Sequence, residues 1–261
     1  MFKLLTLGKR KKKSLFKAVI RILFVLVLLL VAGYYIIQFF SKPPHIKYPA
    51  FGIDIPPNYL LHGIDVSHYQ RLIDWEDVKA MQVKDIRIGF VFIKATEGIG
   101  NIDEQFRRNW LQAEEMQISK GAYHYFIAGK SGKLQARNFI QIVKLKKGDL
   151  PPVLDIEQVS GTPIPDLQKE VKRWLDETEQ YYNTKSVIYT NIDFYNNYLK
   201  GHFDEYPLWI AHYLQPEKPR LQRKWMFWQH SESGRVNGIR TPVDFNVFAG
   251  DSTDFKNSLV K

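Results

Sequence analysis

Asp155 and Glu157 stand two positions apart in the segment Pro-Pro-Val-Leu-Asp-Ile-Glu, and their types and spacing could support chemistry. In a β-strand this spacing places both carboxyl groups on one face, while Leu154 and Ile156 face the other side. Two carboxyl groups held together raise the pKa of one, which leaves a protonated acid beside an ionised partner. Such a pair can protonate a leaving oxygen, as cleavage of a glycosidic bond requires. The alternative is a loop-proximal acidic pair that caps a helix or binds a lysine.

Two further acids interrupt apolar runs in the same way. Asp65 follows Gly63-Ile64, and Asp244 lies in the segment Pro-Val-Asp-Phe-Asn. Each alone is equally compatible with a helix cap or a turn. All four acids, however, fall near the expected carboxyl end of an apolar strand. We therefore predict that Asp65, Asp155, Glu157 and Asp244 meet as one catalytic group.

Several aromatic residues lie on or just after these runs, and aromatic residues make up 14% of the chain. Rings at the mouth of a sugar-binding site can stack on pyranose faces. For any single ring the alternative is packing in the core. The rings considered are Tyr125, Tyr189, Trp209, Tyr213 and Trp228. We assign Phe92 and Phe227 to the core.

Other kinds of catalytic centre find little support. The chain has no cysteine, which excludes thiolate metal sites and cysteine nucleophiles. Its 7 histidines form no zinc-binding pattern, and we expect a structural role for His124. No serine stands in a Gly-x-Ser-x-Gly context, and Gly98-Ile99-Gly100 is predicted to be a turn. We expect neither a metal nor a cofactor.

Strand-length apolar runs alternate with amphipathic stretches from about residue 61 onward. This alternation predicts an α/β fold in which helices cover a mostly parallel sheet. Leu167, Val171, Trp174, Leu175 and Thr178 share one face of an expected helix. Seven or eight strands in about 200 residues indicate a closed barrel, whose strand ends gather polar residues at one mouth. The predicted strands are 63–66, 90–93, 121–126, 152–157, 186–190, 208–211 and 225–229.

The domain from about His62 to Phe248 resembles the glycoside hydrolase family 25 lysozymes, which are N-acetylmuramidases. The resemblance rests on eight short motifs in the family's order, although each motif is weak alone. The motifs begin with Gly63-Ile64-Asp65-Val66-Ser67 (followed by Ile73-Asp74-Trp75), Phe92-Ile93-Lys94-Ala95-Thr96-Glu97-Gly98, Gly121-Ala122-Tyr123-His124-Tyr125-Phe126 and Pro152-Val153-Leu154-Asp155-Ile156-Glu157. They continue with Ile188-Tyr189-Thr190, Leu208-Trp209-Ile210-Ala211-His212-Tyr213, Trp228-Gln229 and Val243-Asp244-Phe245-Asn246.

This resemblance implies an irregular β/α (TIM-like) barrel and hydrolysis of the β-1,4 bond between N-acetylmuramic acid and N-acetylglucosamine in peptidoglycan. It implies that Glu157 is the proton donor, and that Asp155 assists the substrate's 2-acetamido group or the developing positive charge. Asp65 and Asp244 match the other acids of the groove. The predicted substrate-binding residues are Tyr125, Tyr189, Trp209, Tyr213 and Gln229. Stabilisation by the acetamido group and attack by a carboxylate nucleophile both remain open.

Two positions depart from the family pattern. Arg71 stands where the family frequently has glycine, and Phe245 stands where it has leucine. Neither removes a carboxylate, so we expect them to affect the shape of the groove more than the activity.

The basic charge of the chain is concentrated at its N-terminus. Of the net +10, residues 1–21 contribute eight basic side chains and no acid, so the rest of the chain carries only +2. We therefore expect no nucleic-acid binding. Residues 22–40 are 19 residues without a charge, which is close to the length of a membrane span. The positive flank predicts a cytoplasmic N-terminus and an exported domain, periplasmic or extracellular. A cleaved signal peptide is the alternative.

These observations predict four parts. Residues 1–21 are a basic cytoplasmic tail, 22–40 a transmembrane helix, 41–60 a proline-rich linker and 61–261 the barrel domain. The favoured function is a membrane-anchored muramidase acting on peptidoglycan glycan strands. The alternatives are a non-catalytic wall-binding module and an amidase or peptidase of the wall.

Overall fold

The computed structural model describes residues 5–40 and 46–261, which fall into two compact units divided after Pro44. The first unit contains α1 (Leu5–Phe40). Within it, Phe16–Ile37 form a stretch of 22 residues that is long and apolar enough to cross a membrane. The helix thus contains the predicted span, and it begins within the basic segment that precedes it.

The second unit begins with a β-hairpin where we predicted an extended linker. Strands β1 (Ile46–Tyr48) and β2 (Ile53–Ile55) pair in antiparallel fashion. Between them Phe51 is fully buried, and its ring lies 5.2 Å from that of Phe245. The linker prediction therefore fails for residues 46–60, because apolar side chains among the prolines pack onto the domain. Residues 41–45 lie outside the described residues.

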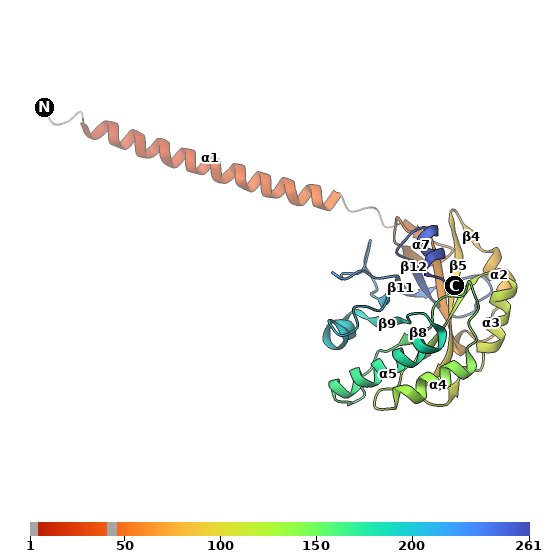
Figure 1. Ribbon diagram of the computed structural model, residues 1–261. Coiled ribbons are helices and arrows are strands. Elements are labelled where there is room, and N and C mark those ends of the chain that lie inside the picture. Colours follow the sequence, from red (N-terminus) through yellow and green to blue (C-terminus); the bar gives the residue numbers. More distant parts are fainter. Residues whose placement is uncertain (1–4, 41–45) are drawn as a thin grey trace. The chain divides into compact units, whose positions relative to one another are not determined.

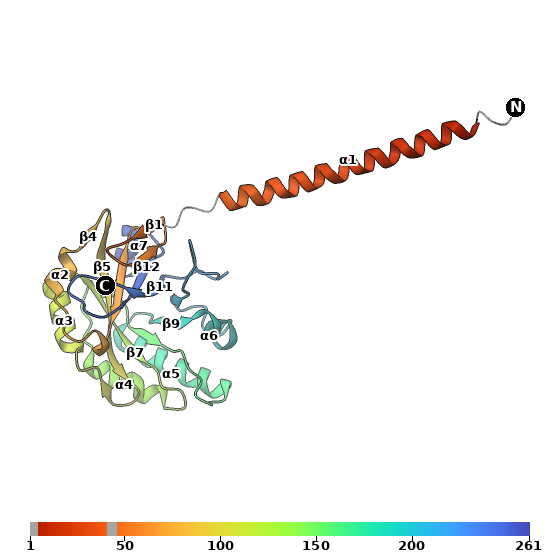
Figure 2. The ribbon, with the colours of Figure 1, turned by 180° about the vertical axis from the view of Figure 1, so that it is seen from behind.

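Eight strands close into the predicted barrel, with helices outside it (Figures 1 and 2). Their order around the barrel is β3, β12, β11, β10, β9, β8, β7 and β5, and β5 pairs with β3 to close it. The strands are β3 (His62–Val66), β5 (Ile86–Glu97), β7 (Ser119–Tyr125), β8 (Val153–Asp155), β9 (Val187–Asn191), β10 (Leu208–Ala211), β11 (Phe227–Gly234) and β12 (Val243–Phe248). Short strands β4 (Gln82–Val83) and β6 (Asn101–Ile102) pair with β5.

The helices follow the strands as the alternating pattern predicted. They are η1 (His68–Gln70), α2 (Trp75–Ala80), α3 (Phe106–Glu115), α4 (Gly132–Ile142), α5 (Ile164–Tyr182), α6 (Ile192–Phe194), η2 (Tyr195–Leu199) and α7 (Ser252–Ser258). The face predicted for α5 is confirmed, since its five residues are buried. The barrel is irregular because residues 212–226, which join β10 to β11, form neither helix nor strand.

Strand β12 runs antiparallel to both of its neighbours, whereas the other barrel strands run parallel to one another. We had predicted that Asp244 lies near the carboxyl end of its strand. It lies instead at the start of β12. The reversal still brings Asp244 to the correct mouth, because its register partner on β3 is Asp65.

Large rings fill the barrel interior, where alternate strand residues form a core of their own. Phe90 and Phe92 are fully buried there, as is Phe227. They fit because glycines face them from adjacent strands. A Cβ on Gly63 would lie 2.4 Å from the Phe90 ring, and one on Gly121 would lie 2.6 Å from Phe92. The filled interior makes the barrel a platform with its working surface at the mouth.

Candidate active site

All nine predicted site residues line one cavity of about 520 Å³ at the mouth of the barrel. The four acids come from β3, the end of β8 and the start of β12. The lining residues predicted to bind substrate come from β7, β9, β10, β11 and the loop after β10. The structure thus brings together side chains that are far apart in the sequence. Their individual roles remain predictions.

Asp155 is the last residue of β8, and Glu157 lies just beyond it. The Ile156 N–H donates to the Tyr189 carbonyl at 3.0 Å, which holds the backbone against β9 past the end of the strand. Leu154 and Ile156 pack in the outer core and Asp155 faces the cavity, as the alternation predicted. Asp155 is buried, and one of its carboxyl oxygens has no hydrogen-bond partner within the described part of the chain.

The two carboxyl groups of this pair share a hydrogen bond. Burial raises the pKa of Asp155 well above its ordinary value, and the negative charge of Glu157 raises it further. Burial also raises the pKa of Glu157, although the hydrogen bond from Asp155 opposes that rise. The pair therefore retains a proton, with Glu157 as its more exposed member.

Asp65 and Asp244 form a second hydrogen-bonded pair on neighbouring antiparallel strands. Asp65 Oδ2 accepts the side-chain amides of Gln229 at 2.8 Å and of Asn246 at 2.7 Å. Burial raises the pKa of Asp65, but the two N–H donors and the hydrogen bond with Asp244 oppose that rise and favour its ionised form over that of Asp244. The shared proton therefore resides on Asp244, where burial and the charge of Asp65 raise the pKa to about 9.

The orientation of both amides follows from their other contacts. Gln229 Oε1 accepts the phenol hydroxyls of Tyr189 at 2.8 Å and Tyr213 at 2.7 Å, so its nitrogen must face Asp65. Asn246 Oδ1 accepts the indole N–H of Trp209 at 2.7 Å, which likewise turns its nitrogen toward Asp65. The Asp65 carboxylate is thus held by a connected network of polar side chains.

The aromatic residues divide into a floor and a wall. Trp209 is 2% exposed and stacks on Phe92 with ring centroids 4.4 Å apart, and Tyr189 is also buried. These two rings form the floor and offer little free face for a sugar. Tyr125 and Tyr213 are partly exposed. Burial raises the pKa of Tyr125 to about 12, so its hydroxyl stays neutral and can donate.

Trp228 belongs to the core instead. It is fully buried, and its indole N–H donates to the carbonyl of His212 at 2.8 Å. His124 is also structural, as predicted, because it is fully buried and its ring contacts Thr96 and Gln135. Residues 98–100 form the predicted turn. Among the described residues, no group of His, Asp and Glu side chains could hold a metal ion.

Sequence reasoning missed several residues of the cavity. They are Tyr123 and the Lys94–Glu97 ion pair, whose N–O distance is 2.6 Å, while the missed Asn246 is fully buried and acts on the cavity by donating to Asp65. The missed signal was the twofold alternation of a strand. Lys94 follows Phe92 by two positions and so faces the same side of β5 as Phe90 and Phe92. Tyr123 lies two positions before Tyr125, and Asn246 lies two positions after Asp244. The remaining lining residues are Val66, Ser67, Tyr69, Gln70 and Glu232.

Known proteins are similar to this chain in sequence. The model of the family "Glycosyl hydrolases family 25" matches residues 64–239. YegX of Escherichia coli K12 is 46% identical over 201 residues, which cover 77% of this chain and 74% of that protein. Lysozyme M1 of Streptomyces globisporus is 34% identical over 207 residues, which cover 74% of this chain and 69% of that enzyme.

A solved structure of a protein with the same fold also matches this chain. The family 25 glycosyl hydrolase of Bacillus anthracis is 31% identical and superposes with a TM-score of 0.72, over 81% of this chain and 99% of that one. The sequence match, the closed barrel and the cavity at its mouth agree. The chain therefore belongs to glycosyl hydrolase family 25 and is a glycoside hydrolase of the lysozyme type.

Proposed function

We propose that this enzyme is an N-acetylmuramidase that hydrolyses the β-1,4 bond between N-acetylmuramic acid and N-acetylglucosamine in peptidoglycan. The observation that carries the proposal is the proton-holding pair of Asp155 and Glu157 in the cavity at the barrel mouth. Membership of family 25 and the similarity to lysozyme M1 give the substrate class. A non-catalytic wall-binding module would not need such a pair.

Glu157 is the member of the pair that can reach a substrate oxygen, because it is only partly buried. In the proposed mechanism it gives the shared proton to the glycosidic oxygen as the bond to the anomeric carbon breaks. The Asp155 carboxyl group, which is more deeply buried and also lines the cavity, holds the proton in the free enzyme. General acid catalysis of this kind contributes about 10²- to 10⁴-fold to a rate.

The spacing within the pair favours assistance by the substrate's acetamido group. In retaining glycosidases with a carboxylate nucleophile, the two carboxyl groups lie about 5 Å apart on either side of the bond. Asp155 and Glu157 hydrogen-bond to each other, which leaves no room for a sugar between them. We therefore assign Asp155 to orienting the acetamido group, whose oxygen attacks the anomeric carbon. Water later displaces that oxygen and gives its proton to Glu157, which restores the shared proton of the pair.

Asp65 and Asp244 have an electrostatic role in this proposal. The network of amides fixes the negative charge of Asp65 close to the reacting pair, and that charge also raises the pKa of Asp155 and Glu157. A fixed negative charge stabilises positive charge that develops on the sugar. Tyr125 and Tyr213 then bind sugar hydroxyls and faces along the wall, above the floor of Tyr189 and Trp209.

The apolar segment of α1 supports attachment to a membrane. We propose that it is an uncleaved anchor, with the basic N-terminus in the cytoplasm and the barrel on the side of the wall. The mass of the mature protein extracted from membranes tests this proposal. Loss of residues up to the Ala32–Gly33 region would identify a cleaved signal sequence instead.

The test of the catalytic assignment is Glu157→Gln. This change keeps the shape of the side chain but removes the transferable proton. We expect no release of reducing ends from purified peptidoglycan and a melting temperature close to that of the wild type. Retained activity would contradict the role of Glu157. Product analysis tests the bond that is cut, because muramic acid at the new reducing end supports the proposal and glucosamine there contradicts it.

A further inference from the structure

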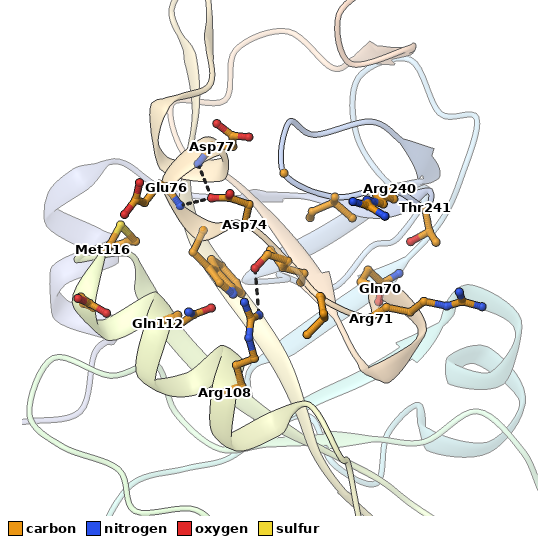
Figure 3. Close-up of a pocket in the computed structure, with 16 residues that line it drawn as sticks. Gln70, Arg71, Asp74, Glu76, Asp77, Arg108, Gln112, Met116, Arg240 and Thr241 are labelled. Carbon is orange, nitrogen blue, oxygen red and sulfur yellow. Dashed lines mark hydrogen bonds between the residues drawn. The ribbon is translucent and has the colours of Figure 1, made fainter.

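A second cavity of about 980 Å³ lies beside the catalytic one and contains none of the four acids (Figure 3). Its walls are the segment from η1 to α2, one face of α3, and residues 238–241 before β12. This volume is at the upper end of the range for small-molecule and cofactor sites, which is about 300–1,000 Å³. The proposed hydrolysis does not use it.

Gln70 lies on the boundary between the two cavities and lines both. Its amide nitrogen donates to the Pro242 carbonyl at 3.1 Å, and its oxygen accepts the Ser67 N–H at 2.9 Å. These bonds fix the side chain between the loop after β3 and the loop before β12. The two cavities therefore adjoin at Gln70.

Opposite charges occupy different sides of the second cavity. Arg71 and Arg240 lie on the side of Gln70, while Glu76 and Asp77 lie across the cavity (Figure 3). In the described part of the chain, none of these four charged groups takes part in an ion pair or side-chain hydrogen bond. Arg108, by contrast, donates to the Ile73 carbonyl at 3.0 Å. Unpaired guanidinium and carboxylate groups that line one cavity are available to a ligand of matching charge.

We propose that the second cavity binds the peptide that muramic acid carries in peptidoglycan. This inference rests on the proposed function, which places the glycan strand in the catalytic cavity. Arg71 and Arg240 would take a carboxylate of the peptide close to the sugar, and Glu76 and Asp77 an amino group further along. The enzyme would then select glycan strands that bear such peptides over bare glycan.

Arg71 can be tested with little risk to the fold. Its φ of 54° lies in the left-handed region, where glycine is unstrained. Arg71→Gly thus removes the guanidinium without new backbone strain, and Arg240→Gln replaces an exposed side chain. Arg87→Gln is the matched control, because Arg87 is exposed at the start of β5, at the other end of the strand from the catalytic mouth.

The experiment measures binding by titration calorimetry at low salt, using the full chain in detergent micelles with Glu157→Gln to prevent turnover. The first probe is the bare disaccharide of N-acetylglucosamine and N-acetylmuramic acid. The second probe is the same disaccharide with a tripeptide on its muramic acid, and this tripeptide has a free glutamate carboxylate and a dibasic third residue. We expect the tripeptide to tighten binding about tenfold, as two charge-assisted contacts would. Arg71→Gly with Arg240→Gln should abolish this gain, and Arg87→Gln should keep it.

A second pair of variants tests the acidic side. Glu76→Gln with Asp77→Asn should weaken binding of the peptide with a free amine and leave binding of its acetylated form unchanged. Equal affinity of the wild type for both disaccharides, or an equal loss in Arg87→Gln, would overturn the proposal. Hydrolysis of peptide-free glycan does not need the second cavity. If the enzyme hydrolyses that glycan, the peptide-binding proposal can fail while the muramidase assignment stands. Absence of binding by both probes would contradict both proposals.

Discussion

The two acid pairs of the active site are built differently. Asp155 and Glu157 are two residues apart and share one strand end, where one oxygen of Asp155 has no partner among the described residues. Asp65 and Asp244 come from opposite ends of the domain and meet through strand register. Asp65 is fixed there by two amide donors. We therefore expect the first pair to move a proton and the second to act as a fixed source of charge.

The same substitution in each pair should separate these roles most clearly. Asp155→Asn keeps a hydrogen bond to Glu157 but cannot hold or release the proton, so we expect kcat to fall about 10³-fold. Asp244→Asn imitates the protonated acid that Asp244 already is, so its loss should stay below about tenfold. Initial rates of reducing-end release from purified peptidoglycan measure both. Equal losses would show that the two pairs do not differ in function.

The rigidity of the second pair depends on Gln229. Gln229→Ala removes two phenol contacts and one donor to Asp65, so we expect the free energy of unfolding to fall by about 3 kcal/mol. Tyr213→Phe removes only one of these bonds and should cost about 1 kcal/mol. Urea unfolding of the full chain in micelles measures both values. If the two variants lost the same stability, Gln229 would not connect the network.

The second pair also predicts how stability varies with pH. The pKa of Asp244 is about 9 in the folded chain, above the ordinary value of about 3.9. Between these values the native state holds a proton that the unfolded state has released, so stability falls as pH rises. Asp244→Asn cannot titrate and should raise the free energy of unfolding at pH 8 by several kcal/mol, with no gain near pH 4.

The control for this pH dependence is an aspartate outside any acid pair. Asp166 is exposed in the first turn of α5, and Asp166→Asn should leave the slope of stability against pH as it is in the wild type. Thermal unfolding between pH 4 and 9 gives the slopes. A slope that persists in Asp244→Asn would place the titrating proton elsewhere.

The same contrast explains how far the sequence could predict the site. Asp155 and Glu157 are local, so strand alternation alone placed both on one face. Apolar runs and helical spacing were sufficient for the barrel and for the buried face of α5. The direction of β12 depends on a long-range pairing with β3, which no local pattern records, so the strand end that carries Asp244 was misjudged.

Other features that the sequence did not predict have similar physical causes. The hairpin at residues 46–55 was hidden because prolines masked apolar residues whose burial is tertiary. Tyr189 and Trp209 line the cavity as its floor, where neighbouring rings cover most of their faces, and their contact with a sugar stays a prediction. The second cavity is formed by three separate segments and has no motif of its own.

The smallest effect we predict concerns Lys94, whose positive charge lowers the pKa of Asp155. Its ammonium lies 4.9 Å from the centre of the Tyr125 ring and pairs with Glu97. Lys94→Met should therefore raise the pKa of the catalytic pair. Because the pair must be protonated to act, the alkaline limb of the rate profile should move up by about one pH unit.

Two further variants isolate the charge effect of Lys94. Lys94→Met combined with Glu97→Gln avoids leaving Glu97 without its partner, and the limb should still move to higher pH because the charge on Lys94 is still absent. Lys130→Met removes an exposed lysine outside the cavity and should leave the profile in place. The profiles are recorded as kcat/KM against pH on peptide-free glycan. An alkaline limb that stayed fixed, or moved to lower pH, would mean that the rate does not depend on a proton held by Asp155 and Glu157.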